Sequence, residues 1–173
     1  GDGWIPFFIM IQNEKKYSEC LKIIHNSAKE KGRETDLITP SLLIPLIVDN
    51  DQNIAYNMLD NALIKSMALL LPAESFKKHN ITHPLGPNFR GLIDFIPSHY
   101  SRETILEAFQ KIPYDLLEAI VFYGTPDDII QKIEDYAKCG LKHIIFNNIT
   151  PFADFSKLSS SIDCIRTIIE YFK

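Results

Sequence analysis

The sequence lacks a long hydrophobic run, a surplus of positive charge and a cysteine framework. No apolar stretch reaches the roughly 18 residues that a membrane-spanning helix needs, and the longest, Trp4 to Ile11, contains a proline. The formal net charge of −4 gives no sign of a nucleic-acid surface or a polybasic membrane patch. The three cysteines are widely spaced and fit free buried thiols in a reducing compartment better than disulfides. We therefore expect a cytoplasmic protein that binds neither membranes nor nucleic acids.

Sequence signatures of several self-contained catalytic sites are also missing. There is no G-x-S-x-G motif and no P-loop. No pair of histidine, cysteine or acidic residues has zinc spacing, and Asp49 with Asp51 is better explained by helix capping than by metal binding. The opening Gly1-Asp2-Gly3 is too short for a dinucleotide fingerprint. We expect no metal site and no complete catalytic centre in these residues.

What remains is an ordinary folded chain. It has 173 residues, of which 46% are hydrophobic and 23% charged, which suits one domain or a piece of a larger one. The first residue is Gly1 rather than Met, and an apolar segment follows almost at once. We interpret this start as the boundary of a fragment.

Four apolar segments predict β-strands, each followed by a helical pattern. Trp4 to Ile11 and Leu42 to Val48 are apolar throughout, as in strands covered on both faces, and shorter strands are expected at 120–123 and 143–146. Pro45 suggests a bulge or an irregular rim in the second strand. Serial strand–helix units without a hairpin predict a parallel sheet with right-handed crossovers.

Capping residues mark where the helices begin. Asn13 and Ser101 are good N-caps, and Thr125 followed by Pro126 and two carboxylates is a strong helix start. A last helix is expected at 156–172. Its inward-facing residues should be the apolar ones at helical spacing, which are Leu158, Ile162, Ile165, Ile169 and Phe172.

Two α/β architectures fit these units. One is a small doubly wound sheet, and the other is half of a (β/α)8 TIM barrel, which takes about 250 residues when complete. The abrupt start favours the half-barrel, with residues 1–173 as about four βα units. An irregular insertion at about 80–100, rich in proline and glycine and containing His83 and His99, interrupts the pattern. Loops of this length in compact domains are often functional.

Three segments, in order, carry a resemblance to a known family. Residues 122–130 (FYGTPDDII) with 136–146 (YAKCGLKHIIF) resemble the closing βαβ unit of luciferase-like monooxygenases, and residues 1–6 (GDGWIP) resemble that family's fifth strand. Residues 83–97 (HPLGPNFRGLIDFIP) look like the branch that contains deazaflavin-dependent ketoreductases and dehydrogenases. The chain is thus similar to the C-terminal half of a luciferase-like monooxygenase superfamily protein.

The resemblance implies a barrel enzyme that uses coenzyme F-420 (a deazaflavin) or FMN. Such an oxidoreductase passes hydride between its cofactor, bound at the C-terminal rim of the strands, and a small organic substrate. In the family, the proton-transfer residues and most cofactor contacts lie in the first half of the barrel, so no catalytic residue is carried over here. Glu118-Ala119 stands where phosphosugar-specific members have basic residues, which favours an apolar carbonyl or alcohol substrate.

Four residues are candidates for binding the substrate. Trp4, the only tryptophan, stands near a strand end and would stack on a ring or pack in the core. Asn147 and Asn148 follow the last strand and would bond a ligand or form a turn. Arg90 would clamp an anionic group, or, like His83 and His99, it would belong to a solvated loop surface.

Two hypotheses about function therefore stay open. The first is half of a flavin- or deazaflavin-dependent oxidoreductase. The second is a non-catalytic α/β binding or assembly module, because no convincing catalytic constellation is present. A half-barrel leaves sheet edges unpaired, so we expect a homodimer or pairing with an N-terminal half-barrel.

Overall fold

The computed structural model describes residues 1–173, and its four strands form one sheet. The strands are β1 (Gly3–Trp4), β2 (Thr39–Val48), β3 (Phe122–Gly124) and β4 (His143–Asn148). Every strand pairing is parallel. The predicted parallel α/β sheet without hairpins is confirmed.

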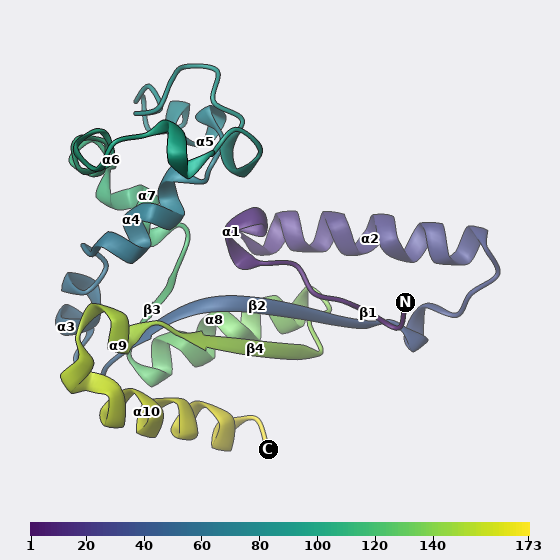
Figure 1. Cartoon of the computed structure of the whole chain (residues 1–173). Helices are drawn as coiled ribbons and strands as arrows, with labels where there is room; N and C mark the ends of the chain where they lie inside the picture. Colours follow the sequence, from purple (N-terminus) through teal and green to yellow (C-terminus); the bar gives the residue numbers. More distant parts are fainter.

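Three long helices and a set of short ones surround this sheet. The long helices are α2 (Glu14–Glu30), α8 (Pro126–Lys138) and α10 (Leu158–Tyr171). The short α-helices are α1 (Phe8–Ile11), α3 (Gln52–Asn57), α4 (Ala62–Leu69), α5 (Ala73–Lys77), α6 (Arg102–Phe109), α7 (Tyr114–Glu118) and α9 (Thr150–Ala153). The 3-10 turns are η1 (Thr35–Leu37), η2 (Gly91–Ile93), η3 (Pro97–His99) and η4 (Phe155–Lys157). In Figure 1, α2 and α10 lie on opposite sides of the sheet, and α4 to α7 form a separate lobe.

Strand β2 is the centre of the sheet, because each of the other strands pairs with it. β1 pairs with its start, β3 with its last three residues and β4 with residues 41–46. The amides of Leu43 and Asp49 donate to the carbonyls of Pro6 and Gly124, whereas the carbonyl of Leu46 accepts from Ile149. Because successive residues of a strand turn their backbone groups to opposite edges, β1 and β3 share one edge of β2 and β4 takes the other. In a closed (β/α)8 barrel each strand would instead pair with the next one along the chain.

This arrangement explains how a proline fits into the central strand. Pro45 pairs in register with Asn147 of β4 and lies in a regular strand, so the predicted bulge is wrong. The N–H that proline lacks would point away from β4, to the edge of β2 that pairs with β1 and β3, as the N–H of Leu43 does. The β1 segment makes its last bridge at Leu43 and β3 begins opposite Leu46. Pro45 thus faces the interval between two strands, where no ladder bond is lost.

The predicted strand from Trp4 to Ile11 is only half a strand. Its pairing ends at Phe7, which bridges Leu43, and α1 begins at the next residue. Gln12 closes α1 with a left-handed φ of 63°. Phe8 and Ile11 are still buried in the core. The apolar run therefore predicts buried residues correctly, whether they lie in a strand or in a helix. Burial alone does not distinguish the two.

The last helix buries a different face from the predicted one. Helix α10 buries Ser161, Cys164 and Ile168 against the sheet. Four of the five residues expected to face inward are exposed, namely Leu158, Ile162, Ile169 and Phe172, and Ile165 packs partly on the core. Ser161 explains why the helix buries this face. Its hydroxyl accepts a hydrogen bond from Asn148 of β4 and keeps this side of the helix against the sheet.

Two hydrophobic clusters hold the molecule together. One fills the lobe of α4 to α7 and reaches the sheet through Ile47 and Val121. The other packs α2, α8 and α10 on β2 and contains the edge-to-face pair Phe8–Phe122, with ring centroids 4.8 Å apart. The predicted caps are confirmed: the side chains of Asn13, Ser101 and Thr125 accept bonds from the first turns of α2, α6 and α8.

The start of α8 generates a stability prediction. The Thr125 hydroxyl accepts from the Asp128 amide, and the Asp128 carboxylate accepts from the Thr125 amide at 2.8 Å. We expect Thr125→Ala to lower the free energy of unfolding by about 1 kcal/mol, because the helix loses its N-cap. Urea unfolding followed by circular dichroism measures this change. Thr167→Ala, at an exposed site inside α10, is the control and should cause no comparable loss. Equal midpoints for Thr125→Ala and the parent chain would contradict the capping argument.

Candidate functional site

An apolar cavity of about 360 Å³ lies beyond the end of the β1 segment. One wall comes from α1 through Ile9 and Met10, and the opposite wall from the lobe through Leu71. The turn η2 adds Leu92 and Ile93, whose side chains, like that of Met10, are largely exposed at its lip. In α/β proteins ligands bind at the carboxyl ends of strands. This cavity is therefore the best-placed candidate for a ligand site.

Arg90 borders this cavity but already has a partner. Its guanidinium donates to Asp94 Oδ1 from Nη2 at 2.6 Å and from Nε at 2.9 Å, and its amide donates to Asp94 Oδ2. The guanidinium bond keeps the pKa of the Asp94 carboxyl below its ordinary value. The arginine side chain is 70% exposed. An anionic ligand would have to compete with Asp94 for the guanidinium.

The two histidines of the irregular segment differ in their surroundings. His99 is exposed, as expected for a solvated loop. His83 is only 2% exposed, so for this residue the prediction of a solvated surface is wrong. Its ring stacks on Phe89 and meets Phe76 edge-on, with centroids 4.4 and 4.3 Å away. The sequence did not predict this aromatic box, because most of the segment that holds it has no helical or strand periodicity.

Asn148 belongs to a hydrogen-bonded network at the end of β4. Its amide group donates to Ser161 Oγ at 2.9 Å, and its carbonyl accepts from the Thr150 amide. The Thr150 hydroxyl in turn accepts from the amide of Val48, the last residue of β2. Both ends of the Asn148 side chain are thus occupied in joining β4, β2 and α10.

Asn147 and Trp4 lie on other parts of the molecule. Asn147 is exposed, and it points to the face of β4 opposite to Asn148. Trp4 pairs with Pro40 near the start of β2, and its ring lies 5.0 Å from that of Tyr17. Asn148 pairs with Leu46, six residues further along β2, which corresponds to about 20 Å. The structure therefore does not bring the four predicted residues together.

A buried ion pair that the sequence did not predict lies at the end of β2. Asp49 is 5% exposed, and its Oδ2 lies 2.8 Å from Lys157 Nζ of η4. This contact raises the pKa of Lys157. Asp51, two residues later, is the N-cap of α3, as its sequence position suggested. The partner of Asp49 could not be found from sequence because Lys157 is more than a hundred positions away.

Most backbone donors in the loops after β3 and β4 are already used. At the start of α8, Pro126 has no N–H, and the Asp128 carboxylate accepts from both the amide and the hydroxyl of Thr125. After β4, the Thr150 amide donates to Asn148. Barrel enzymes bind phosphate at these two loops through free N–H groups. Here those positions present carboxylates and mostly occupied amides, and they disfavour a phosphate.

Comparison with known proteins finds one matching family model and several curated relatives. The family model described as luciferase-like monooxygenase matches residues 1–143. Phthiodiolone/phenolphthiodiolone dimycocerosates ketoreductase of Mycobacterium bovis is 31% identical over 147 residues, which make up 85% of this chain and 38% of that protein. The protein of the same name from Mycobacterium kansasii is 29% identical, over 85% of this chain and 40% of its own length. The chain therefore spans about two fifths of the curated relatives that it matches.

Solved structures show the same relation. The coenzyme F-420-dependent tetrahydromethanopterin reductase from Methanopyrus kandleri matches with a TM-score of 0.66 and 20% identity, over all of this chain and 46% of its own. An F-420-dependent secondary alcohol dehydrogenase, solved with an F-420–acetone adduct, matches with a TM-score of 0.61 and 16% identity, over 97% of this chain and 43% of its own. The fold class is thus confirmed as the partial half of a (β/α)8 TIM barrel, although β4 pairs with β2. No helix of this chain has both the length and the apolarity to span a membrane.

The buried imidazole of His83 makes stability depend on pH. Burial lowers its pKa below the ordinary 6.5, so the folded chain binds this proton less readily than the unfolded chain does. The contribution of neutral His83 is complete above pH 6.5 and is lost as the pH falls toward the lowered value. We expect His83→Asn, which keeps an acceptor for the Leu85 amide, to flatten the fall in unfolding free energy between pH 7 and 5. Urea unfolding at several pH values measures it.

His99→Asn is the matched control, because it removes an exposed imidazole from the same segment. It should leave the pH dependence of the parent chain in place. A His83→Asn variant that loses as much stability on acidification as the parent would show that His83 is not the group responsible.

Proposed function

Because this chain belongs to the luciferase-like monooxygenase family, we propose that it forms the C-terminal half of a flavin- or deazaflavin-dependent oxidoreductase and supplies the wall on which the substrate binds. The curated relatives are ketoreductases by name, and one matched structure is a secondary alcohol dehydrogenase. These names support hydride transfer between a reduced cofactor and a carbonyl carbon. The activity belongs to the whole protein, of which this chain is a part.

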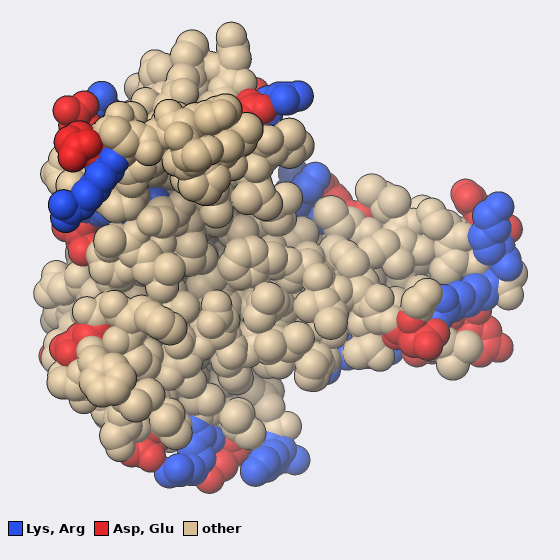
Figure 2. Space-filling model, in the orientation of Figure 1, with Lys and Arg blue, Asp and Glu red and all other residues tan.

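The cavity beyond β1 is the single observation that carries the proposal. Its walls are mostly aliphatic, and Met10, Leu92 and Ile93 continue the apolar surface outward from its lip. Figure 2 shows few charged side chains over the middle of the molecule, with most of them at the ends of α2 and around the lobe and α10. Apolar surface of this kind favours an uncharged ketone or alcohol that carries an alkyl chain.

The cofactor fits this chain only in part. The loops after β3 and β4 oppose a phosphate, because Asp128 and Asn148 occupy their donors. The phosphate of FMN or coenzyme F-420 is therefore assigned to the N-terminal half of the barrel. When bound there, the cofactor supplies the hydride chemistry. This chain's residues bind the apolar part of the substrate and keep water away from it.

The four predicted substrate-binding residues take different parts in this proposal. Arg90 stands at the cavity and is the one that would bind a polar group of the ligand, in exchange with Asp94. Asn147 has an exposed amide on the last strand. Asn148 would act by holding β4 and α10 in place. Trp4 would stiffen the start of the sheet through Tyr17.

The uncovered surfaces around β4 support a partner. β4 pairs only with β2, so its second edge is free. Beside it runs a groove of about 460 Å³ whose lining includes Phe146, Ile169 and Phe172. A free parallel edge next to an apolar groove suits another strand and its helix. We propose that the N-terminal half-barrel covers this surface or, alternatively, that a second copy of the chain covers it in a homodimer. The alternative function, a non-catalytic assembly module, draws on the same surface.

A binding experiment tests the substrate wall. Decan-2-one, an uncharged ketone with an alkyl chain, is titrated into the chain and followed by methyl chemical shifts. We expect shifts at Met10, Leu71 and Ile93. Ile93→Asp places a charge at the lip, where Ile93 is 76% exposed, so the fold is kept. The variant should weaken binding about tenfold, through lost apolar contact and a carboxylate that resists dehydration.

Phe155→Asp is the matched control, because Phe155 is equally exposed but lies in η4, away from the cavity. It should bind the ketone as the parent chain does. Equal weakening by both variants, or shifts confined to another surface, would sink the proposed wall. FMN and coenzyme F-420, titrated in parallel, should give no saturable binding to this chain alone.

Association is the second expected property. Light scattering over a range of concentrations should show dimers whose proportion rises with concentration, because β4 and α10 bury apolar surface on pairing. Ile169→Asp, at an exposed position of α10 that lines the groove, should shift the chain toward monomers. Thr167→Asp, which faces solvent on the same helix, should not. A chain that stays monomeric at high concentration would contradict the proposed pairing surface.

A further inference from the structure

A smaller cavity of about 130 Å³ lies where α1, α2, α7 and α8 meet. Unlike the cavity beyond β1, it gathers chemically active side chains. Glu14 comes from α2, Glu118 from α7, and Lys132 with Tyr136 from α8, over an aromatic floor of Phe8 and Phe122. The family resemblance refers only to Glu118, and the proposed function uses none of these groups.

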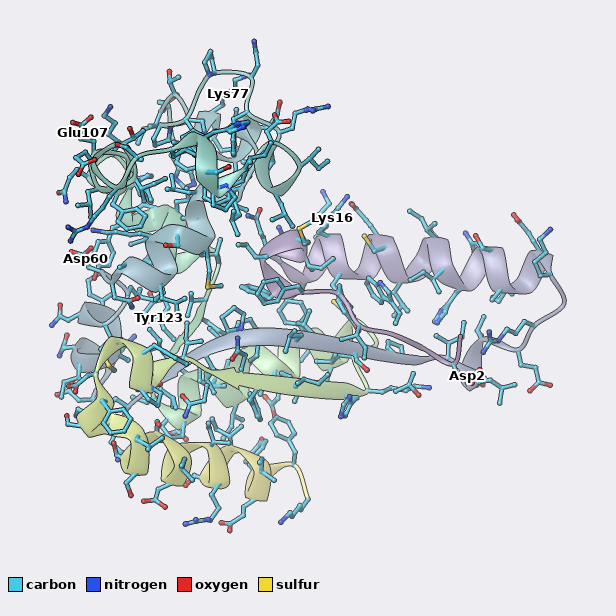
Figure 3. The ribbon with its side chains drawn as sticks, in the orientation of Figure 1. Asp2, Lys16, Asp60, Lys77, Glu107 and Tyr123 are labelled. Atoms are coloured by element: carbon cyan, nitrogen blue, oxygen red, sulfur yellow. The ribbon has the colours of Figure 1, made fainter.

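Lys132 is the only amine in this cavity, and it has no ionic partner. It takes part in none of the six ion pairs of the structure. Its Nζ lies instead over aromatic rings, 4.7 Å from the centroid of Tyr123 and 5.6 Å from that of Phe122. Tyr123 lies between the lobe and the sheet (Figure 3). Burial lowers the pKa of Lys132, although Asp128, Glu118 and Glu14 oppose the shift. A larger share of this amine is therefore neutral at pH 7 than of an ordinary lysine.

Tyr136 brings a second unused group into the same cavity. It stands one helical turn after Lys132 and is 1% exposed, and its hydroxyl has no hydrogen-bond partner. Burial raises the pKa of this phenol, so it keeps its proton. Buried hydroxyls without a partner are rare, because their desolvation is not repaid. A ligand oxygen beside Lys132 would satisfy it.

The carboxylates around Lys132 are partly occupied elsewhere. Asp128 accepts from Thr125 in the capping box. Glu118 accepts from the Tyr123 hydroxyl at 3.1 Å, and burial together with this bond raises the pKa of Tyr123 to about 12. Glu14 makes no side-chain hydrogen bond and remains as a proton acceptor at the cavity. With Glu14 and Glu118 in its wall, the cavity disfavours anions.

We propose that Lys132 is the nucleophile of a covalent site for small, uncharged aldehydes or ketones. The Nζ lone pair attacks the carbonyl carbon, and the C=O π electrons move to the oxygen, which receives a proton and becomes the hydroxyl of a carbinolamine. Tyr136 donates a hydrogen bond to this oxygen. The hydroxyl then takes up a second proton and leaves as water, the nitrogen gives up its own second proton to replace it, and a C=N bond remains. The net change is amine plus carbonyl to imine plus water, with no oxidant or reductant.

Lys138 provides a matched comparison within the same helix. Its Nζ pairs with Asp135 at 2.7 Å, its side chain is 69% exposed, and that contact raises its pKa. The chain is treated with propanal and cyanoborohydride, which reduces any imine to a stable amine, and alkylated lysines are quantified by peptide mass spectrometry. At pH 7 we expect Lys132 to be alkylated severalfold faster than Lys138, because burial lowers the pKa of the first amine and the Asp135 contact raises that of the second.

Two further readouts separate a built site from a merely reactive amine. Tyr136→Phe keeps the ring and removes the hydroxyl, so it should slow alkylation at Lys132 severalfold and leave Lys138 unchanged. With naphthaldehyde, which is too large for the cavity, alkylation at Lys132 should no longer be faster than at the exposed Lys138. Circular dichroism confirms that the variant is folded.

The outcomes decide the proposal clearly. Alkylation of Lys132 no faster than that of Lys138 would overturn it. Fast alkylation that ignores both the Tyr136 hydroxyl and the size of the aldehyde would also overturn it, because the cavity would then play no part. Fast, size-selective alkylation that depends on the hydroxyl would establish the site.

Discussion

The structure depends on the pairing of one strand with all the others. β2 is ten residues long and accepts β1 and β3 on one edge and β4 on the other. Pro45 is tolerated in the middle of this strand because its missing donor faces the interval between β1 and β3. The same interval lets the chain leave the sheet after Phe7 and form α1. The α1 wall of the cavity beyond β1 thus results from the point at which the pairing with β2 stops.

At the carboxyl ends of the strands, the polar residues and the apolar residues have different roles. Asn148, Thr150 and Ser161 use their donors and acceptors on one another, and Asp49 is held by Lys157. These contacts fasten β2, β4 and the last helix, and they leave few free donors for a phosphate. The cavity beyond β1 is correspondingly apolar. A half-barrel built in this way can position a hydrophobic substrate, and it leaves the cofactor's charged groups to the other half.

Lys132 belongs neither to the polar network at the strand ends nor to the apolar cavity beyond β1. It is a basic residue on a helix face that otherwise buries Ile129, Ile133 and Tyr136. A charged lysine side chain is costly to bury without an ionic partner. The aromatic rings of Phe122 and Tyr123 offset part of that cost. The cavity in front of the amine leaves it accessible to a small molecule, which gives this position a use that capping and packing do not explain.

The sequence by itself determined the parallel α/β class, the family and the helix starts, because these depend on local patterns. Asn13, Ser101 and Thr125 cap helices through bonds that span three residues. Only the tertiary structure decided that Phe8 to Ile11 is a helix, that α10 turns Ser161 inward, that His83 is buried, and that Trp4, Arg90 and Asn148 lie apart. These features depend on contacts that no periodic pattern specifies, such as Leu43 for Phe7 or Asn148 for Ser161. A periodic apolar pattern shows that a residue is buried, but the contact that buries it is fixed only when the strands pair.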